Sequence, residues 1–457
     1  MLVQGNSVEN GGDGGAPSAK TWGIYVYFAA DVPDPLMQAA VWTTLQTIAS
    51  VGSSDSVKIT AMIDLPDRDT EYYIIPPRPS DPKITRWPLL PDRFLSNVNS
   101  ASIDTILDFF EWSHLNCPAE HIALIFWGHG YALDDFDPRI KQKATLAAAQ
   151  AGGAMGRAVG TFPADNGNEL KLLYDKTHNS VLSNRDFAQA IRGFTETFNG
   201  RKPIQVLGLD CCNMAMAEVL AELQGLTEYA VAAETALPFQ SWLAAPILRK
   251  FLSDPEGTPK QFAVAAVKYF VGSMAQSGNT FIELSACNLL SFERLETAMK
   301  MLVDALLPAI ERHENRLAIA QAWLNDVSFL PDGMIDLASF CGLLRTTIPK
   351  NAAVDASGKP VLTWMENAVI LAAWEVQKAV QSVVAFRGIA PPLQGRKIAL
   401  STGLSIWFPP WIQFPGVRYV QMQQSKDYLF NGYSTTLFAR VTGWDCFLQR
   451  LFLLTQR

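Results

Sequence analysis

Short apolar runs that alternate with helix-forming segments constrain the fold of this 457-residue chain most strongly. Residues 22–30 (WGIYVYFAA) and residues 57–65 are rich in β-branched and aromatic side chains, which predicts two buried strands. Between them, Asp34 and Pro35 mark the start of a helix over 36–50, with aspartate as the N-cap and proline at the first helical position. A strand, a helix and a second strand in this order predict a βαβ unit with parallel strands and a right-handed crossover.

The same alternation continues as far as residue 312 and predicts an α/β fold with a mostly parallel sheet flanked by helices. Beyond it the chain is mainly helical, and strands return near 397–408. We therefore expect a mobile tail over 1–20, an α/β domain over 21–312 and a C-terminal domain over 313–457 that packs on it. The further expected strands are 72–75, 121–126, one within 170–182, 203–209, 229–233, 280–284, 397–400 and 404–408. The further expected helices are 103–114, 184–198, 213–223, 242–252, 259–271, 289–312, 317–324, 337–348, 364–384 and 434–454.

The composition excludes several classes of protein. Hydrophobic residues make up 49% of the chain and charged residues 18%, which is typical of a globular protein. The net charge of −7 argues against a nucleic-acid partner, and no apolar run approaches the ~20 residues of a membrane span. The six cysteines include no CxxC pair, so neither a disulfide framework nor a zinc site is expected. The N-terminal segment lacks the charged start and apolar core of a secretion signal, which favours the cytoplasm and leaves export open.

Reactive side chains follow two of the predicted strands at the point where each strand ends. His129 comes after the strand over 121–126, and the adjacent thiols Cys211 and Cys212 come after the strand over 203–209. Because the carboxyl ends of neighbouring parallel strands lie side by side, the imidazole and a thiol can come within about 4–7 Å of each other. A thiol has an ordinary pKa of about 8.5 and needs such a partner, as base or as cation, to react at neutral pH.

Two further features of these strand ends suit nucleophilic chemistry. The segment 213–223 predicts a helix directly after Cys212, and the dipole at a helix N-terminus favours a thiolate over a thiol. Gly130, next to His129, allows a close backbone approach, so its N–H and the N–H of Cys212 are the candidates for an oxyanion hole.

Four stretches in this order resemble the clostripain family of the caspase-like (clan CD) cysteine peptidases. They are the opening strand with its Ala-Ala-Asp end (WGIYVYFAADVP), the histidine segment WGHG over 127–130, the cysteine segment with Asp210, Cys212, Met214 and Glu218, and GLSIWFP over 403–409. The resemblance runs from about residue 20 to the C-terminus.

The resemblance implies a caspase-like fold and a cysteine endopeptidase that acts on a peptide or protein substrate. We expect the chain to be a monomer. Cys212 takes the place of the nucleophile and His129 that of its base or ion-pair partner. Asp210 takes the place of a residue that lines the S1 pocket and favours Arg or Lys at P1, as a buried carboxylate would. Calcium dependence occurs in this family, whereas the sequence shows only scattered acidic residues and no calcium loop, so no cofactor is expected and a calcium requirement stays open.

Two departures from the family pattern bear on the site. Cys211 replaces a small residue between the aspartate and the nucleophile, and it adds a second sulfur. Where the family often has Pro-Gly-acid-Gly-Trp, this chain has PFQSW over 238–242, so Gln240 and Trp242 are expected to contact the substrate and the strictness of Arg/Lys selection stays open.

The segment 131–169 lies between the histidine and cysteine stretches, where members of the family are activated by self-cleavage after a basic residue. Lys143 is the first candidate for such a cut, because it borders a tract of small residues that is easily nicked. An uncleaved, flexible insertion is the alternative.

Two other functions remain open at this point. The chain could be a caspase-like protein that binds peptides without cutting them. It could also be a thiol transpeptidase or ligase that uses the same two side chains.

Overall fold

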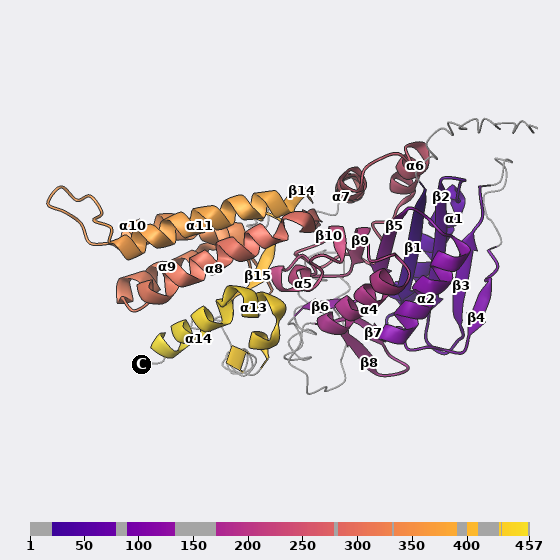
Figure 1. The fold of residues 1–457 in the computed structure, drawn as a ribbon, viewed down its shortest axis with the longest axis horizontal. Coiled ribbons are helices and arrows are strands. Elements are labelled where there is room, and N and C mark those ends of the chain that lie inside the picture. Colours follow the sequence, from indigo (N-terminus) through magenta and orange to yellow (C-terminus); the bar gives the residue numbers. More distant parts are fainter. Residues whose placement is uncertain are drawn as a thin grey trace, which may run out of the picture.

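The computed structural model describes residues 21–78, 89–132, 171–277, 282–330, 333–390, 400–409, 429–430 and 432–455. Its centre is a nine-stranded sheet (Figure 1). Five inner strands run parallel and two antiparallel strands extend the sheet on either side, which confirms the predicted mostly parallel sheet. The order is β14 (Val384–Ile389), β11 (Glu283–Asn288), β10 (Thr227–Ala232), β9 (Ile204–Asp210), β5 (His121–Trp127), β1 (Trp22–Ala29), β2 (Val57–Asp64), β3 (Thr70–Ile75) and β4 (Arg93–Leu95).

Helices cover both faces of this sheet, so its inner strands are buried on both sides, as parallel strands require. Alternate side chains of β1 enter two separate cores: Tyr25 and Tyr27 lie in one, and Ile24 and Val26 in the other. The Tyr25 face is covered by α2 (Ile103–Asn116), α4 (Asn184–Thr197) and α5 (Ala217–Glu222). The Ile24 face is covered by α1 (Pro35–Val51), α6 (Ala245–Ser253) and α7 (Pro259–Gln276).

The first βαβ unit forms as its sequence predicts. The Asp34 side chain accepts a hydrogen bond from the Leu36 N–H at 2.9 Å, and Pro35 opens α1. β1 and β2 then pair in parallel from Trp22–Val57 to Ala29–Asp64.

A helical arm extends from one end of the sheet (Figure 1). The most extensive helix packing in the arm is between α8 and α11. After α11 the chain returns to the sheet as β14, which pairs with β11, so the region expected as a second domain contributes a strand to the first. The arm contains α8 (Phe292–Ala309), α9 (His313–Asn325), α10 (Leu337–Asn351), α11 (Trp364–Val383), α13 (Leu437–Thr442) and α14 (Trp444–Thr455).

Two small sheets complete the fold. One consists of β12 (Ser328–Leu330), β13 (Met334–Asp336) and β15 (Ser405–Trp407). The other consists of β6 (Gly130–Ala132), β7 (Lys171–Asp175) and β8 (Ser180–Ser183).

Several elements differ from the sequence expectation. The helix expected over 213–223 begins only at Ala217, and the strand expected over 280–284 lies at Glu283–Asn288. Strand β14 was not expected, because its apolar residues follow α11 without a glycine or proline that would mark the end of the helix. Most of the strand expected over 397–400 lies outside the described residues.

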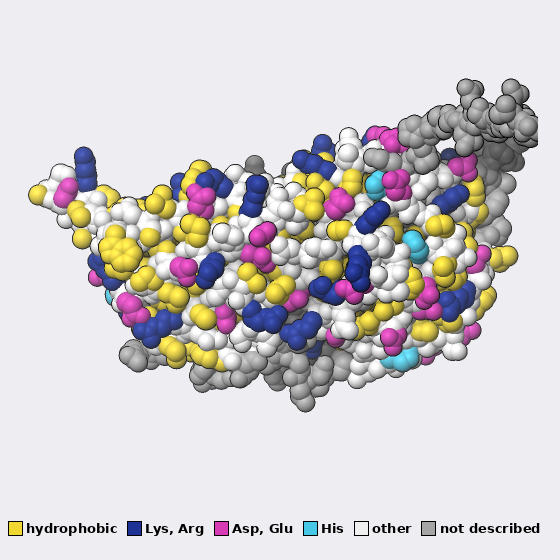
Figure 2. Space-filling model, in the orientation of Figure 1, with side chains coloured by type: hydrophobic (Ala, Val, Ile, Leu, Met, Phe, Trp, Pro, Cys, Tyr) yellow, Lys and Arg dark blue, Asp and Glu magenta, His cyan; other side chains and the backbone are white. Residues whose placement is uncertain are grey.

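The surface in Figure 2 carries acidic and basic side chains intermixed, with no stripe of lysine and arginine on the face shown. Among the described residues, no helix is long and apolar enough to cross a membrane.

Candidate active site

His129 and Cys212 follow neighbouring strands at the same edge of the central sheet. β5 and β9 pair in parallel as far as Trp127 and Asp210, and the Gly128 N–H donates to the Asp210 carbonyl at 3.5 Å. Each reactive residue therefore lies two positions beyond the last paired residue of its strand. The parallel register brings the two segments to the same edge of the sheet.

The two adjacent thiols lie on opposite faces of the sheet. Cys212 belongs to the core that contains Ile125 and Trp127, whereas Cys211 belongs to the other core and its Sγ lies 3.7 Å from the Phe126 carbonyl. Cys212 therefore lies on the face of the Trp127 side chain, and Cys211 lies on the opposite face.

Gly130 is required by the closeness of the two segments. A Cβ on this residue would overlap the Cys212 carbonyl and lie 2.8 Å from the Cys212 nitrogen and 3.0 Å from the Cys211 Cβ. Only glycine allows this approach, which brings the backbone of the histidine segment against the backbone of the nucleophile.

The predicted helix dipole at Cys212 is wrong. Asn213 takes a left-handed conformation with φ of 59°, and the Ala215 N–H donates to the Ala233 carbonyl at 2.8 Å. These constraints delay the helix until Ala217, and α5 is only six residues long. The thiol instead accepts a hydrogen bond from the Leu237 N–H, at 3.2 Å from Sγ, and such a donor favours the charged form of a sulfur.

Asp210 lies on the same face as Cys212 and is fully buried. Its Oδ2 accepts hydrogen bonds from the Ser241 hydroxyl at 2.5 Å and from the Trp242 N–H at 3.2 Å. The last two residues of the PFQSW segment thus hold this carboxylate in place. The sequence analysis did not single out Ser241, although it lies between the two candidate residues Gln240 and Trp242.

The residues of the PFQSW segment differ in exposure. Gln240 is exposed, Phe239 is half-buried and Trp242 is fully buried. The Trp242 ring covers Gly208 of β9, where a Cβ would overlap it. Trp242 therefore forms the base of the region beside Asp210, and Gln240 lies where a ligand can reach it.

A comparison with known protein families finds a match over the part of the chain that contains β9. The sequence profile of the clostripain family matches residues 164–369, a span that contains Asp210 and Cys212 and begins after His129. Residues 164–369 of this chain thus match the clostripain family of cysteine endopeptidases.

Two solved structures of this family share the fold over nearly their whole length. One is an inactive zymogen C11 protease from Parabacteroides distasonis, and the other is a secreted C11 cysteine protease from Bacteroides thetaiotaomicron in complex with an irreversible peptide inhibitor. Each is 12% identical to this chain, has a TM-score of 0.59 and is matched over 93% of this chain and 99% of its own. A third structure, of the Bacteroides thetaiotaomicron protease iotapain, has a TM-score of 0.57 at 10% identity. No curated protein matches the chain.

The clostripain-like site is closed in this structure. Cys212 is fully buried and His129 is 1% exposed. The backbone of the histidine is also fixed, because the Leu173 N–H of β7 donates to the His129 carbonyl at 2.9 Å. A peptide can therefore reach the thiol only after a local rearrangement.

Two nearby acidic residues serve the fold. Glu218 is buried, and its Oε1 accepts hydrogen bonds from the Trp407 N–H at 2.9 Å and the Tyr433 hydroxyl at 2.6 Å. Glu234 accepts from the Gly403 N–H at 3.0 Å, and burial raises its pKa well above the usual range. Both residues attach the C-terminal segment to the sheet.

Lys143 lies outside the described residues, as does residue range 133–170 of the expected self-cleavage segment. Among the described residues, the one set of three carboxylate, imidazole or thiol groups close enough to share a metal ion consists of Asp31, Asp64 and Asp175. Neither His129 nor a cysteine belongs to it.

Proposed function

We propose that this chain hydrolyses peptide bonds with Cys212 as the nucleophile and His129 as its base or ion-pair partner. The observation that carries the proposal is the position of both residues two places beyond paired strand ends, with Cys212 and the β5 residues Ile125 and Trp127 on one face of the sheet.

The reaction follows from these positions. The Cys212 thiolate attacks the carbonyl carbon of the scissile bond, and the N–H groups of Gly130 and Cys212 stabilise the oxyanion. The C–N bond breaks as His129 gives a proton to the leaving amine, which leaves a thioester on Cys212. Water, deprotonated by His129, then attacks the thioester, releases the carboxylate product and restores the thiol.

A preference for Arg or Lys at P1 is the finer part of the proposal. Asp210 supports it, because its carboxylate is buried on the Cys212 face and is held by two donors that favour the ionised form. A cationic P1 side chain would compensate this buried charge. Gln240, at the exposed end of the same segment, would contact the substrate, and Trp242 would support the pocket from beneath.

Activation by self-cleavage is a further part. The burial of Cys212 and His129 supports an inactive starting state. We place the cut after Lys143, with Lys141 and Arg157, which also lie in or beside the tract of small residues, as the other candidates. Intact mass of the wild-type protein before and after incubation identifies the cut, which must disappear in Cys212→Ala and move or slow in Lys143→Ala.

A peptide library with varied P1 residues tests the function, with Cys212→Ala and Cys211→Ala as a matched pair. We expect Cys212→Ala to lower turnover at least about 10³-fold, because it removes the nucleophile, and Cys211→Ala to retain it. Binding of peptides without turnover in the wild-type protein would instead identify a peptide-binding protein. Joined peptide products would identify a transpeptidase or ligase.

A further inference from the structure

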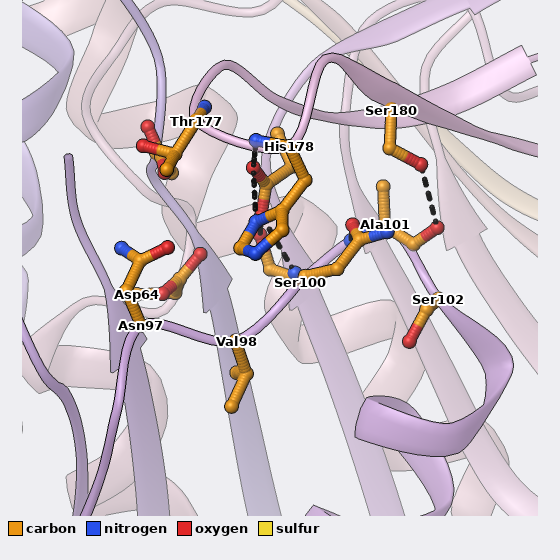
Figure 3. Close-up of polar contacts among 12 residues, drawn as sticks. Asp64, Asn97, Val98, Ser100, Ala101, Ser102, Thr177, His178 and Ser180 are labelled. Carbon is orange, nitrogen blue, oxygen red and sulfur yellow. Dashed lines mark hydrogen bonds and ion pairs between the residues drawn. The ribbon is translucent and has the colours of Figure 1, made fainter.

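Two buried carboxylates end parallel strands at the same edge of the central sheet, and their surroundings differ. Asp64 ends β2 and lies beside the segment 97–102 (Figure 3), where its Oδ1 accepts a hydrogen bond from the Thr70 hydroxyl at 2.7 Å. Asp210 ends β9, three strands away in the sheet, and its hydrogen bonds go to the PFQSW segment. Asp210 is therefore the acid of the nucleophile segment, and its bonds decide what it offers to a substrate.

The protein itself occupies one oxygen of Asp210. Oδ2 accepts one hydrogen bond from the Ser241 hydroxyl at 2.5 Å and another from the Trp242 N–H at 3.2 Å. A carboxylate oxygen has two lone-pair directions, and these two donors take both of them. A P1 side chain must therefore reach Asp210 through its other oxygen, Oδ1.

The direction of the Ser241 hydroxyl is fixed by a further bond. The Leu243 N–H donates to Ser241 Oγ at 3.0 Å, so this oxygen already serves as an acceptor on one side. An ionised carboxylate can only accept, so the single proton of the hydroxyl is directed to Asp210 Oδ2. Ser241 therefore acts on Asp210 as a fixed donor.

These bonds lie on the buried side of the PFQSW segment. Ser241 is 4% exposed, and the Trp242 ring packs where a Cβ on Gly208 of β9 would overlap it. Gln240, the neighbour of Ser241 in the chain, is exposed. When the closed site opens for a peptide, we expect the exposed part of the segment to move and Ser241 and Trp242 to stay on Asp210.

Arginine and lysine side chains use a carboxylate in different ways. A guanidinium pairs best through two parallel N–H···O bonds, one to each oxygen of the carboxylate. An ammonium is a compact charge with rotatable donors, and a single oxygen is enough for it. An aspartate that offers one oxygen therefore removes the second bond of an arginine and leaves the bond of a lysine intact.

We propose that Ser241 makes this site prefer Lys over Arg at P1, because it and the Trp242 N–H occupy the oxygen of Asp210 that a bidentate guanidinium needs. The inference rests on the proposed role of Asp210 at P1 and goes beyond it, since the carboxylate alone favours either cation. Ser241 stands at the second glycine of the family pattern Pro-Gly-acid-Gly-Trp, and glycine has no hydroxyl. The preference is thus a property of this chain. Ser241 contacts Asp210 and not the peptide, so it is a positioning residue.

Hydrolysis of peptides that differ only at P1 tests the preference. In the wild-type protein, kcat/KM for P1 Lys should exceed that for P1 Arg by about 3–10-fold. Ser241→Ala opens one lone pair of Oδ2 to a guanidinium, so the Lys-to-Arg ratio of kcat/KM should fall about 10-fold, mainly through a lower KM for Arg. Ser241→Thr keeps the hydroxyl and should keep the ratio. A merely structural role would lower kcat/KM for both peptides and leave the ratio unchanged.

The control for the loss of a hydroxyl is Ser253→Ala, an exposed residue at the end of α6, which should not change the ratio. A wild-type protein that prefers Arg would overturn the proposal. So would a Lys-to-Arg ratio that is the same in Ser241→Ala as in the wild-type protein.

A binding measurement separates this inference from the proposed peptidase function. Peptides that end in Lys or Arg are products of cleavage and are not cut at that residue, so calorimetry on the wild-type protein measures their affinities without turnover. If no peptide is hydrolysed, the peptidase proposal fails, and tighter binding of the Lys peptide than of the Arg peptide still supports the role of Ser241. Equal affinities, or binding of neither peptide, would overturn that role.

Discussion

The catalytic edge and the C-terminal junction of this protein both bury carboxylates, but their hydrogen bonds go to different places. At the catalytic edge, Asp210 is bonded to Ser241 and Trp242, close to the thiol on the same face. At the junction, Glu218 and Glu234 are bonded to Trp407 and Gly403, which are far away in the sequence. A buried acid that bonds to a distant segment stabilises the fold. An acid whose bonds stay within the site is instead available to bind the substrate. This difference predicts that substitutions at the edge change activity and that substitutions at the junction change stability.

Apart from substitution of Cys212 itself, the largest effect is expected from Gly130→Ala. The new Cβ would overlap the Cys212 backbone, so the histidine segment must move away from the nucleophile. A displacement of about 1 Å costs about 10²-fold in rate, and the loss of the oxyanion donor adds to it, so kcat/KM should fall at least 10²-fold. Peptide hydrolysis measures the effect, and Gly272→Ala, where a Cβ meets no atom within 4 Å, is the control. Full activity of Gly130→Ala would show that the two segments do not act together.

The second effect is specific to the substrate. Asp210→Asn keeps an acceptor for Ser241 and Trp242 but removes the charge, so kcat/KM for P1 Arg and Lys peptides should fall about 10²-fold, as for the loss of a buried charge pair. Peptides with P1 Gln or Met are the internal control and should change little. An equal loss on all peptides would assign Asp210 to the support of Cys212 instead of the selection of P1.

Local sequence signals predicted the five parallel strands of the sheet but not β4 or β14, because only the former are long apolar runs. Strand-end motifs likewise supplied His129 and Cys212 as the candidate reactive residues. They did not predict the conformation after Cys212. Met214, Ala215 and Met216 are good helix formers, yet bonds from Ala215 to Ala233 and Ser405 hold them extended. That information lies in segments far away in the chain.

At the junction, Glu218→Ala should lower stability and spare activity. It leaves the Trp407 N–H and the Tyr433 hydroxyl without their acceptor in a buried place, which should cost about 2–4 kcal/mol of the free energy of unfolding. Urea unfolding measures this, and Glu196→Ala, an exposed residue of α4, is the control. Lower kcat/KM in fully folded Glu218→Ala would contradict the separation of the two regions.

The smallest effect is a pH dependence of stability at the same junction. Burial raises the pKa of Glu283 from 4.5 to about 7, and its neighbours Glu234 and Asp336 are buried carboxylates with raised pKa values as well. A folded pKa above the unfolded value means that the stabilisation is complete below about pH 4.5 and is lost as the pH rises through 7. From pH 5 to pH 8 the free energy of unfolding should therefore decline by about 1–3 kcal/mol through this group.

In Glu283→Gln this decline of the free energy of unfolding with pH should become shallower, since glutamine does not ionise. Urea unfolding at both pH values in the Cys212→Ala background measures the slope, and an unchanged slope in Glu283→Gln would mean that Glu283 is ionised in the folded protein.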